Sequence, residues 1–163
     1  MTSTSKTGSE PSTALPPGGP SPAPYSVLIA LGSNLGDRAL SLRRAVAALA
    51  PDVRVVRLSK VHETAPVDSP PGSPPFLNMV VAGHTMLSPA ALLDRLLAIE
   101  ARLGRRRPRG VRNAPRNIDL DLILHSGHRA RTRRLTLPHA RYRERDFVMT
   151  PARELGLNWP ALR

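Results

Sequence analysis

The sequence predicts an α+β domain in which helices pack on one face of an antiparallel sheet. Three observations support this class: short apolar runs that end at glycine or proline, two amphipathic stretches with helical spacing between them, and a composition close to that of globular proteins. Hydrophobic residues make up 40% of the chain and charged residues 22%, so most of the chain can form a core. A length of 163 residues fits one domain.

The first predicted elements are a strand and a helix. Residues 25–31 form a short apolar run closed by Gly32, which is typical of a buried strand. Asp37 can cap a helix of about three turns that Pro51 ends. The apolar residues of this helix recur at helical spacing: Leu42, Ala45, Val46 and Leu49.

Two more strands are predicted on either side of a proline-rich loop. Residues 53–63 predict a strand whose apolar residues fall out of phase, so we expect a bulge or a long edge strand. Residues 66–75 contain five prolines and must form a loop. Residues 76–82 then predict a third, buried strand.

The clearest helix of the chain follows. Ser88 is its expected N-cap, Pro89 occupies its first turn, and Gly104 lies just beyond its end. Its apolar stripe consists of Leu92, Leu96, Ile99 and Leu103.

A loop, a strand and a helix complete the predicted domain. Residues 105–115 are rich in arginine, glycine and proline without any period, and residues 117–124 predict a strand with two unlike faces. Ile118, Leu120, Leu122 and Leu124 are expected on one face, and Asp119 and Asp121 on the other. After a basic connector, residues 147–155 predict a last helix. The resulting order β-α-β-β-α-β is the ferredoxin-like arrangement, a βαββαβ core.

The N-terminal residues predict a disordered tail. Residues 1–24 contain six prolines with repeated Ser, Thr and Gly, and only Lys6 and Glu10 are charged. The folded domain is therefore expected over residues 25–163. The tail residues contain no secretory signal, and they lack the arginine that transit peptides usually contain. No apolar run is long enough to span a bilayer, so we expect a soluble, cytoplasmic protein without a membrane partner.

The absence of cysteine and the excess of basic residues exclude some classes of function and favour others. The absence of cysteine excludes a disulfide scaffold, thiolate zinc sites, iron–sulfur clusters and a cysteine nucleophile. Basic residues number 24 against 12 acidic ones, and 22 of the basic residues are arginine. This excess favours phosphate binding by guanidinium groups, although an arginine-biased genome would give the same composition.

The strongest chemical signal is the pair Asp119 and Asp121. Residues two apart on a strand share one face at about 6.6 Å along the chain. Mg²⁺ commonly takes one or two carboxylates together with substrate phosphates, although an amphipathic strand with a solvated face would show the same pattern. The neighbouring loop favours the metal site, because guanidinium groups beside a dicarboxylate form a polyphosphate cradle. The arginines of that loop are Arg105, Arg106, Arg107, Arg112 and Arg116.

The remaining polar features are less specific. No Walker-type phosphate loop is present, and the segment Gly32–Gly36 is best interpreted as a turn from strand to helix. His139 lies among arginines that disfavour its protonated form, so we expect a hydrogen-bond donor to phosphate or nucleotide rather than a general base. Glu100 lies at the polar border of the second predicted helix, and its default interpretation is a solvated surface residue.

Four blocks in this order resemble the 6-hydroxymethyl-7,8-dihydropterin pyrophosphokinases of folate biosynthesis. The blocks are residues 31–38 (LGSNLGDR), residues 63–66 (ETAP) with 76–78 (FLN), residues 104–122 with the run APRNIDLDL, and residues 135–139 (LTLPH) with Arg145 and Phe147. The resemblance implies transfer of a diphosphate from ATP to the hydroxymethyl group of the reduced pterin, with release of AMP. ATP and the pterin would be the partners, without nucleic acid.

The resemblance also implies a role for each matching residue. Asp119 and Asp121 would bind two Mg²⁺ ions that bridge the ATP phosphates, and Arg105 and Arg116 would stabilise the charge that moves on those phosphates. The residues implied for the pterin are Thr64, Phe76, Asn78 and Phe147. The residues implied for ATP are Glu100, Arg107, Arg134, Thr136, His139 and Arg145.

The chain departs from the family pattern in four places. The loop segment 110–113 lacks the tryptophan that many relatives have, Ala140 replaces an aromatic residue, residues 129–131 replace an apolar edge strand, and relatives commonly continue past Arg163. Two alternatives remain. The first is an RNA-binding domain, but five aromatic residues leave few rings on which bases could stack. The second is an inactive relative, and the intact motif residues argue against it. We expect a monomer, because no apolar stripe is obvious.

Overall fold

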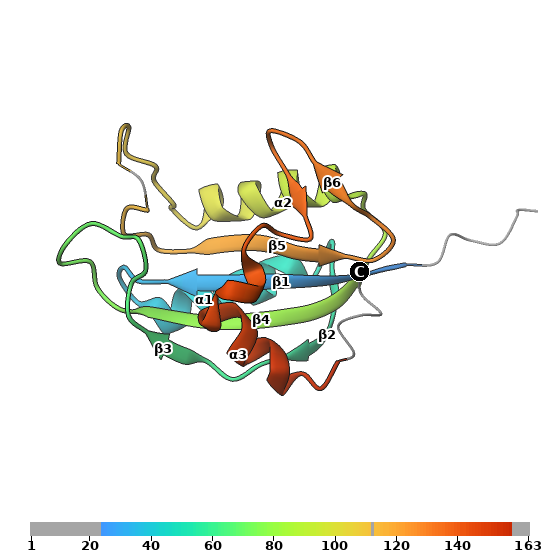
Figure 1. Cartoon of the computed structure of the whole chain (residues 1–163), viewed down its shortest axis with the longest axis horizontal. Helices are drawn as coiled ribbons and strands as arrows, with labels where there is room; N and C mark the ends of the chain where they lie inside the picture. Colours follow the sequence, from blue (N-terminus) through green and yellow to red (C-terminus); the bar gives the residue numbers. More distant parts are fainter. Residues whose placement is uncertain (1–23, 112, 158–163) are drawn as a thin grey trace, which may run out of the picture.

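A computed structural model of the chain describes residues 24–111 and 113–157, so residues 1–23 of the predicted tail lie outside the described residues. The elements are drawn in Figure 1. In chain order they are β1 (Tyr25–Ser33), α1 (Arg38–Leu49), β2 (Arg54–Leu58), β3 (His62–Thr64), β4 (Phe76–Thr85), α2 (Pro89–Arg102), β5 (Asp119–His125), β6 (Ala130–Arg131), β7 (Thr136–Leu137), a 3₁₀ helix η1 (Tyr142–Glu144) and α3 (Asp146–Glu154).

The main sheet has the strand order β2-β4-β1-β5, with β3 also paired to β4, and every pairing is antiparallel. The two long strands β1 and β4 are paired in the centre. The predicted ferredoxin-like arrangement is therefore confirmed. Its two helices begin where predicted, because Asp37 accepts the Leu40 N–H at 2.9 Å and Ser88 accepts the Ala91 N–H at 3.3 Å.

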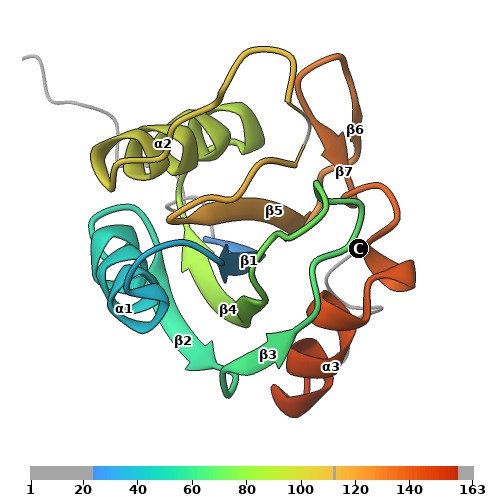
Figure 2. The same ribbon diagram turned by 90° about the vertical axis from the view of Figure 1, so that its left-hand side faces the viewer.

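The expected placement of helices on one face holds for the two helices of the βαββαβ core and is wrong for the last helix. Helices α1 and α2 cover one face of the sheet and α3 covers the other, as Figure 2 shows. The continuous apolar run of β1 explains both layers, because its alternate residues are buried in opposite directions. Ile29 and Leu31 pack toward α1 and α2, whereas Leu28 packs with Val148 and Leu155 of the α3 layer.

A bulge in β5 overturns one further prediction. Leu28 lies opposite Leu124 and Ile29 lies opposite Leu122, so Ile123 is an extra residue in the pairing. Leu124 consequently packs in the α3 layer and not beside Leu122 as predicted. The alternation predicted for residues 118–122 holds, and it places Asp119 and Asp121 on the α3 face.

The predicted strand 53–63 is an edge segment in two parts, β2 and β3. The expected bulge is present, since Val55 lies opposite Gly83 and Arg57 opposite Ala82. Ser59 then ends β2 by turning its hydroxyl inward, where it accepts the Val80 N–H at 2.9 Å. The central strand β4 extends three residues past the predicted end, to Thr85.

The basic connector contains structure that the sequence did not predict. Strands β6 and β7 form a small separate hairpin, and η1 follows before α3. These elements bring His139 and Arg145 back beside β5, where the His139 N–H donates to the Ile123 carbonyl at 2.8 Å and Arg145 lies 3.6 Å from the Asp121 carboxylate. Within the described part of the chain, none of the helices has the length and apolar character needed to cross a bilayer.

Candidate active site

Asp119 and Asp121 lie at the start of β5, on the face of the sheet that α3 covers. Their neighbours on β1 are small, because Gly32 lies opposite Asp119 and Ala30 lies opposite Asp121. The Asp119 side chain is 18% exposed and that of Asp121 is 36% exposed. The two carboxylates therefore face a hollow in the sheet surface and not a packed layer.

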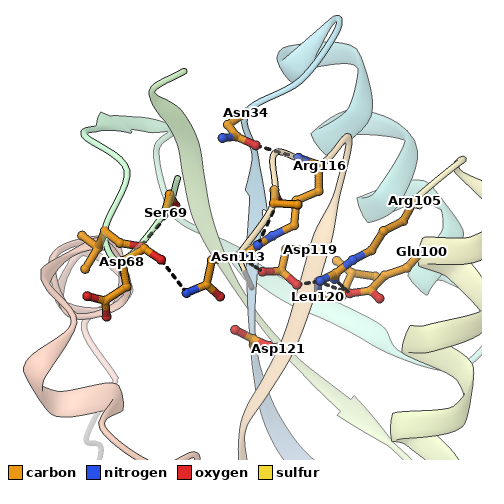
Figure 3. A network of polar contacts seen from close by, with 12 residues as sticks. Asn34, Asp68, Ser69, Glu100, Arg105, Asn113, Arg116, Asp119, Leu120 and Asp121 are labelled. Atoms are coloured by element: carbon orange, nitrogen blue, oxygen red, sulfur yellow. Dashed lines mark hydrogen bonds and ion pairs between the residues drawn. The ribbon is translucent and has the colours of Figure 1, made fainter. Parts of the chain in front are cut away.

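Asp119 is held by two arginines of the preceding loop (Figure 3). Arg116 contacts one carboxylate oxygen at 2.7 Å, and Arg105 contacts the other. Burial disfavours the ionised form of Asp119, but the charges of Arg116 and Arg105 outweigh burial and hold the pKa of this carboxyl below its ordinary value.

Asp121 has the opposite character. Its nearest cation is Arg145, at 3.6 Å. Burial and the negative charge of Asp119 together raise the pKa of Asp121 to about 6, against the opposing charge of Arg145. Two carboxylates of unlike basicity thus share one edge of the hollow: Asp119 is paired with two arginines, and Asp121 with Arg145 alone at a longer distance among the described residues.

Glu100 connects the arginine loop to β5. Its side chain is 3% exposed, so the default interpretation as solvated surface is wrong. One oxygen accepts the Leu120 N–H at 2.8 Å and contacts Arg105, and the other accepts Arg107 at 2.8 Å. Burial raises the pKa of Glu100, although the Leu120 N–H and the charge of Arg105 oppose this rise. Glu100 therefore fixes the base of the loop that supplies Arg105 and Arg107.

The four residues expected to bind pterin line a single cavity of about 290 Å³. Phe76 and Asn78 come from β4, Thr64 from β3 and Phe147 from α3. The Asn78 amide donates to the Thr64 hydroxyl at 2.7 Å, which fixes the orientation of the amide. We call this space the aromatic cavity.

A second cavity of about 330 Å³ lies on the other side of the aspartates. Five of its twelve lining residues are arginines, among them Arg105, Arg106 and Arg107, and His139 also lines it. Burial and the neighbouring charge of Arg145 lower the pKa of His139, so a neutral imidazole is favoured, as expected from the sequence. We call this space the basic cavity. The residues that line both cavities are Asn113, Arg116, Asp119, Asp121 and Arg145.

Two predicted ATP residues lie apart from these cavities. The Arg134 side chain is 65% exposed and pairs with Asp94 of α2 at 2.6 Å. Thr136 on β7 lines a third, open cavity of about 600 Å³ with Arg129 and Arg131. The resemblance assigned Arg134 and Thr136 to ATP together with His139 and Arg145, but the β6–β7 hairpin holds Arg134 and Thr136 apart from the basic cavity.

Asn34 is a residue that sequence reasoning missed. It is 1% exposed, its amide oxygen accepts the Arg116 N–H at 2.8 Å, and its amide nitrogen donates to the Pro74 carbonyl at 3.1 Å. Its own N–H donates to the Arg116 carbonyl at 3.1 Å. Asn34 thus joins the proline loop to the arginine loop and fixes the backbone of Arg116 (Figure 3). The sequence signals at this position were a turn between two glycines and the family block LGSNLGDR, and neither indicated these contacts.

Three further residues were also missed at the rim of the aromatic cavity. Among the described residues, Asp68, Asn113 and Arg141 are the non-glycine residues with left-handed backbone, at φ of 51°, 51° and 62°. The Asn113 amide donates to the Asp68 carbonyl at 2.8 Å, and Arg141 lies 3.9 Å from the Asp68 carboxylate. Left-handed backbone at such residues costs energy, so contacts between three loops must stabilise this rim.

The donor set suits a magnesium ion that substrate phosphates help to bind. Among the described residues, no group of three or more His, Cys, Asp and Glu side chains could hold a metal. The chain instead offers two carboxylates on one face, and one of them is destabilised by the negative charge of the other. Mg²⁺ is commonly bound by one or two carboxylates plus phosphate oxygens and water, so these residues fit it.

Comparisons with known proteins identify related sequences and a shared fold. A family model described as 7,8-dihydro-6-hydroxymethylpterin-pyrophosphokinase (HPPK) matches residues 28–156. A 2-amino-4-hydroxy-6-hydroxymethyldihydropteridine pyrophosphokinase of Bacillus subtilis is 44% identical over 129 residues, which are 78% of this chain and 75% of that protein. A protein of the same name from Methylorubrum extorquens is 44% identical over 78% of this chain and 80% of its own length.

Fused relatives also match. The mitochondrial folate synthesis bifunctional protein of Pisum sativum is 40% identical over 79% of this chain, which spans 25% of that protein. A solved HPPK-DHPS structure in complex with substrates superposes with a TM-score of 0.56 at 12% identity, over 78% of this chain and 39% of the other. At this identity the superposition shows the shared fold alone.

Proposed function

The chain belongs to the 7,8-dihydro-6-hydroxymethylpterin-pyrophosphokinase family, and we propose that its aromatic and basic cavities bind the two substrates of that family's reaction. The protein is an ATP-dependent diphosphotransferase of folate biosynthesis. It transfers diphosphate from ATP to the hydroxymethyl group of 6-hydroxymethyl-7,8-dihydropterin and releases AMP. The observation that supports our assignment of the site is the wall that both cavities share, because it contains Asp119, Asp121, Arg116 and Arg145.

The pterin would occupy the aromatic cavity. Phe76 and Phe147 lie on different elements and line the same space, so their faces can enclose a flat bicyclic ring. Asn78 offers an amide that both donates and accepts, and its bond to Thr64 sets which group points to the ligand. This combination suits a heterocycle with alternating donors and acceptors along one edge.

The phosphates of ATP would occupy the basic cavity. Arg105, Arg107 and Arg116 surround it, and Glu100 holds the first two in place. Asp119 and Asp121 would hold Mg²⁺ at the shared wall. When bound there, magnesium would neutralise phosphate charge and help position the triphosphate.

The chemistry needs positioning more than proton transfer. The pterin hydroxyl oxygen forms a bond to the β-phosphorus of ATP while the bond from that phosphorus to the bridging oxygen of AMP breaks, and the hydroxyl proton passes to water. Negative charge moves onto the departing oxygen, where Arg105 and Arg116 can stabilise it. His139, favoured as neutral, can donate a hydrogen bond in the basic cavity without adding charge.

Residues outside the two cavities would bind the parts of the nucleotide beyond its phosphates. Thr136 lines the third cavity, and the exposed pair of Arg134 with Asp94 is weak enough to open for a ligand. We also propose a cytoplasmic monomer, which the net charge of +12 supports through self-repulsion. Gel filtration of the protein would test the monomer.

A direct assay tests the proposed function. The purified protein, given ATP, Mg²⁺ and the reduced pterin, should release AMP and not ADP. Asp119→Ala and Asp121→Ala should each fold, bind pterin and turn over about 10²–10⁴-fold more slowly, because the carboxylates position the charge-neutralising ion. Asp52→Ala, which removes a carboxylate paired with Arg95 outside both cavities, is the matched control and should keep its rate. Near-normal rates in both site variants would refute the assignment.

A further inference from the structure

Arg38, the first residue of α1, contacts both ends of the proline loop that joins β3 to β4. Its Nη1 donates to the Pro75 carbonyl at 2.8 Å and lies 2.9 Å from the Glu63 carboxylate. Glu63 is on β3, one residue before that strand ends, and Pro75 is the last residue before β4. A single guanidinium nitrogen therefore connects the end of one strand to the start of the next.

The loop itself has few backbone donors with which to fix the entry into β4. Residues 66–75 contain five prolines, and proline has no N–H to donate. The carbonyls of Pro74 and Pro75 are bound instead by side chains at the start of α1 and in the turn before it, Asn34 at 3.1 Å and Arg38 at 2.8 Å. The chain just before Phe76 is thus positioned from α1 and its preceding turn.

The two ends that Arg38 contacts adjoin residues of the aromatic cavity. Thr64 follows Glu63, Phe76 follows Pro75, and Thr64 lies opposite Phe76 in the pairing of β3 with β4. Thr64 and Phe76 both line the aromatic cavity, whereas Arg38 is not part of its lining. Movement of the two ends would therefore change the spacing between the Thr64 hydroxyl and the Phe76 ring.

Fold stability explains little of this contact. The Arg38 side chain is 29% exposed and that of Glu63 is 56% exposed, and ion pairs in contact with solvent stabilise folded proteins only slightly. β3 has only three residues paired to β4, so a directed contact from α1 affects the position of β3 more than the stability of the whole domain.

We infer that Arg38 is a positioning residue for pterin binding, which sets the spacing of Thr64 and Phe76 from outside the aromatic cavity by holding Pro75 and Glu63. The inference rests on the proposed function, in which Arg38 touches neither substrate. The effect is selective for pterin, because none of the residues that line the basic cavity comes from β3, the proline loop or β4.

The test measures the two substrates separately in Arg38→Ala. Binding of 6-hydroxymethylpterin, measured by calorimetry with a non-hydrolysable ATP analogue present, should weaken by about tenfold, the effect of one lost hydrogen bond from a charged group. Affinity for the ATP analogue should not change. Arg95→Ala is the matched control, because it removes a helix arginine that pairs with Asp52 at 2.8 Å outside both cavities. The control should bind both ligands as the wild type does, and the two variants should have similar thermal midpoints.

Further variants separate positioning from general damage. Both contacts come from one Arg38 nitrogen, and lysine carries three donors on a single nitrogen, so Arg38→Lys should recover most of the pterin affinity. Glu63→Ala removes one of the two contacts and should weaken pterin binding less than Arg38→Ala does. In steady-state kinetics, Arg38→Ala should raise the KM for pterin with little change in kcat, because Arg38 lies outside both cavities.

Four results would each overturn the inference. They are wild-type pterin affinity in Arg38→Ala, an equal loss of affinity for the ATP analogue, an Arg38→Ala protein that does not fold, and an Arg38→Lys protein that binds pterin as weakly as Arg38→Ala. A wild-type protein that binds no pterin would instead refute the proposed function itself, so the two failures are distinguishable.

Discussion

The two aspartates should affect folding stability in opposite directions when metal and substrates are absent. Asp121 has a pKa of about 6, above its ordinary value, so the folded state binds more protons than the unfolded state between about pH 4 and pH 6. Its ionisation therefore costs stability at neutral pH, and this cost disappears as the pH falls below about 4. Asp119 has a lowered pKa, so it contributes stability at neutral pH that is lost as acid protonates it.

The size of the Asp121 effect follows from its pKa and exposure. A rise of about two pH units corresponds to about 3 kcal/mol for a fully shielded group. Because the Asp121 side chain is 36% exposed, solvent screening reduces this to about 1 kcal/mol. Asp121→Asn should then raise the midpoint of thermal unfolding by about 4 °C at pH 7.5. Asp119→Asn removes a partner from both Arg105 and Arg116 and should lower stability by about 2 kcal/mol.

Circular dichroism melts in EDTA at pH 7.5 and pH 4.5 measure both effects. The gain from Asp121→Asn should be present at pH 7.5 and fall to about one third of that size at pH 4.5. Both variants should be inactive in the AMP assay, so that Asp121→Asn gains stability at the expense of turnover. Equal signs for the two variants at pH 7.5, or a gain at pH 4.5 as large as at pH 7.5, would refute the reasoning.

Three more predictions follow from buried contacts. Asn34→Ala leaves the Arg116 N–H without its acceptor, so the free energy of unfolding in urea should fall by about 2–3 kcal/mol. The substitution should lower kcat more than it lowers pterin affinity. Unchanged stability would contradict the role of this residue. Glu100→Ala should lower the free energy of unfolding by about 3 kcal/mol. Glu100→Gln should lower it clearly less, because the glutamine side chain, unlike alanine, can still accept the Leu120 N–H. Equal losses in the two variants would count against the hydrogen bond from Leu120. His125, whose pKa burial lowers, should make the fold lose stability as the pH falls below about 6.5. His125→Gln should flatten that part of the pH profile, and an unaltered profile would exclude His125 as its source.

Local sequence signals predicted the elements because those signals act over a few residues. Asp37 and Ser88 cap their helices within three residues, so no distant partner is needed to recognise them. The face of Asp119 and Asp121 was predictable because strict alternation holds over residues 118–122. The bulge at Ile123 was not predictable, since residues 122–124 are all apolar and only the pairing with β1 decides which of them is extra.

The position of α3 shows a second limit of the same kind. Its apolar residues predict a buried face, but they do not specify which side of the sheet receives it. The sequence of β1 contained the missing information, because a strand that is apolar at every position needs cover on both faces. With α1 and α2 on one side, the residues around Leu28 require α3 on the other.

The site was predictable where side chains have chemistry of their own, and not where they act through backbone atoms. Phe76, Asn78 and Phe147 matched a family motif, and the structure gathers them in one cavity. Asn34 and Asn113 were missed because their partners are carbonyl and amide groups of loops distant in sequence. Such contacts depend on loop conformation, which composition and periodicity do not specify.

The shared wall links the two cavities through single side chains. Arg116 lies 5.3 Å from the centre of the Phe76 ring and also contacts Asp119, and Arg145 lies 5.6 Å from the Phe147 ring and also contacts Asp121.

Each arginine thus joins an aromatic face of one cavity to a carboxylate that borders the other. If the two cavities bind the substrates as proposed, a pterin between the rings would compete with or stack beside these guanidinium groups, and phosphates would draw the same groups from the aspartates. Occupation of one cavity would then change the charges available in the other, because the same two arginines border both.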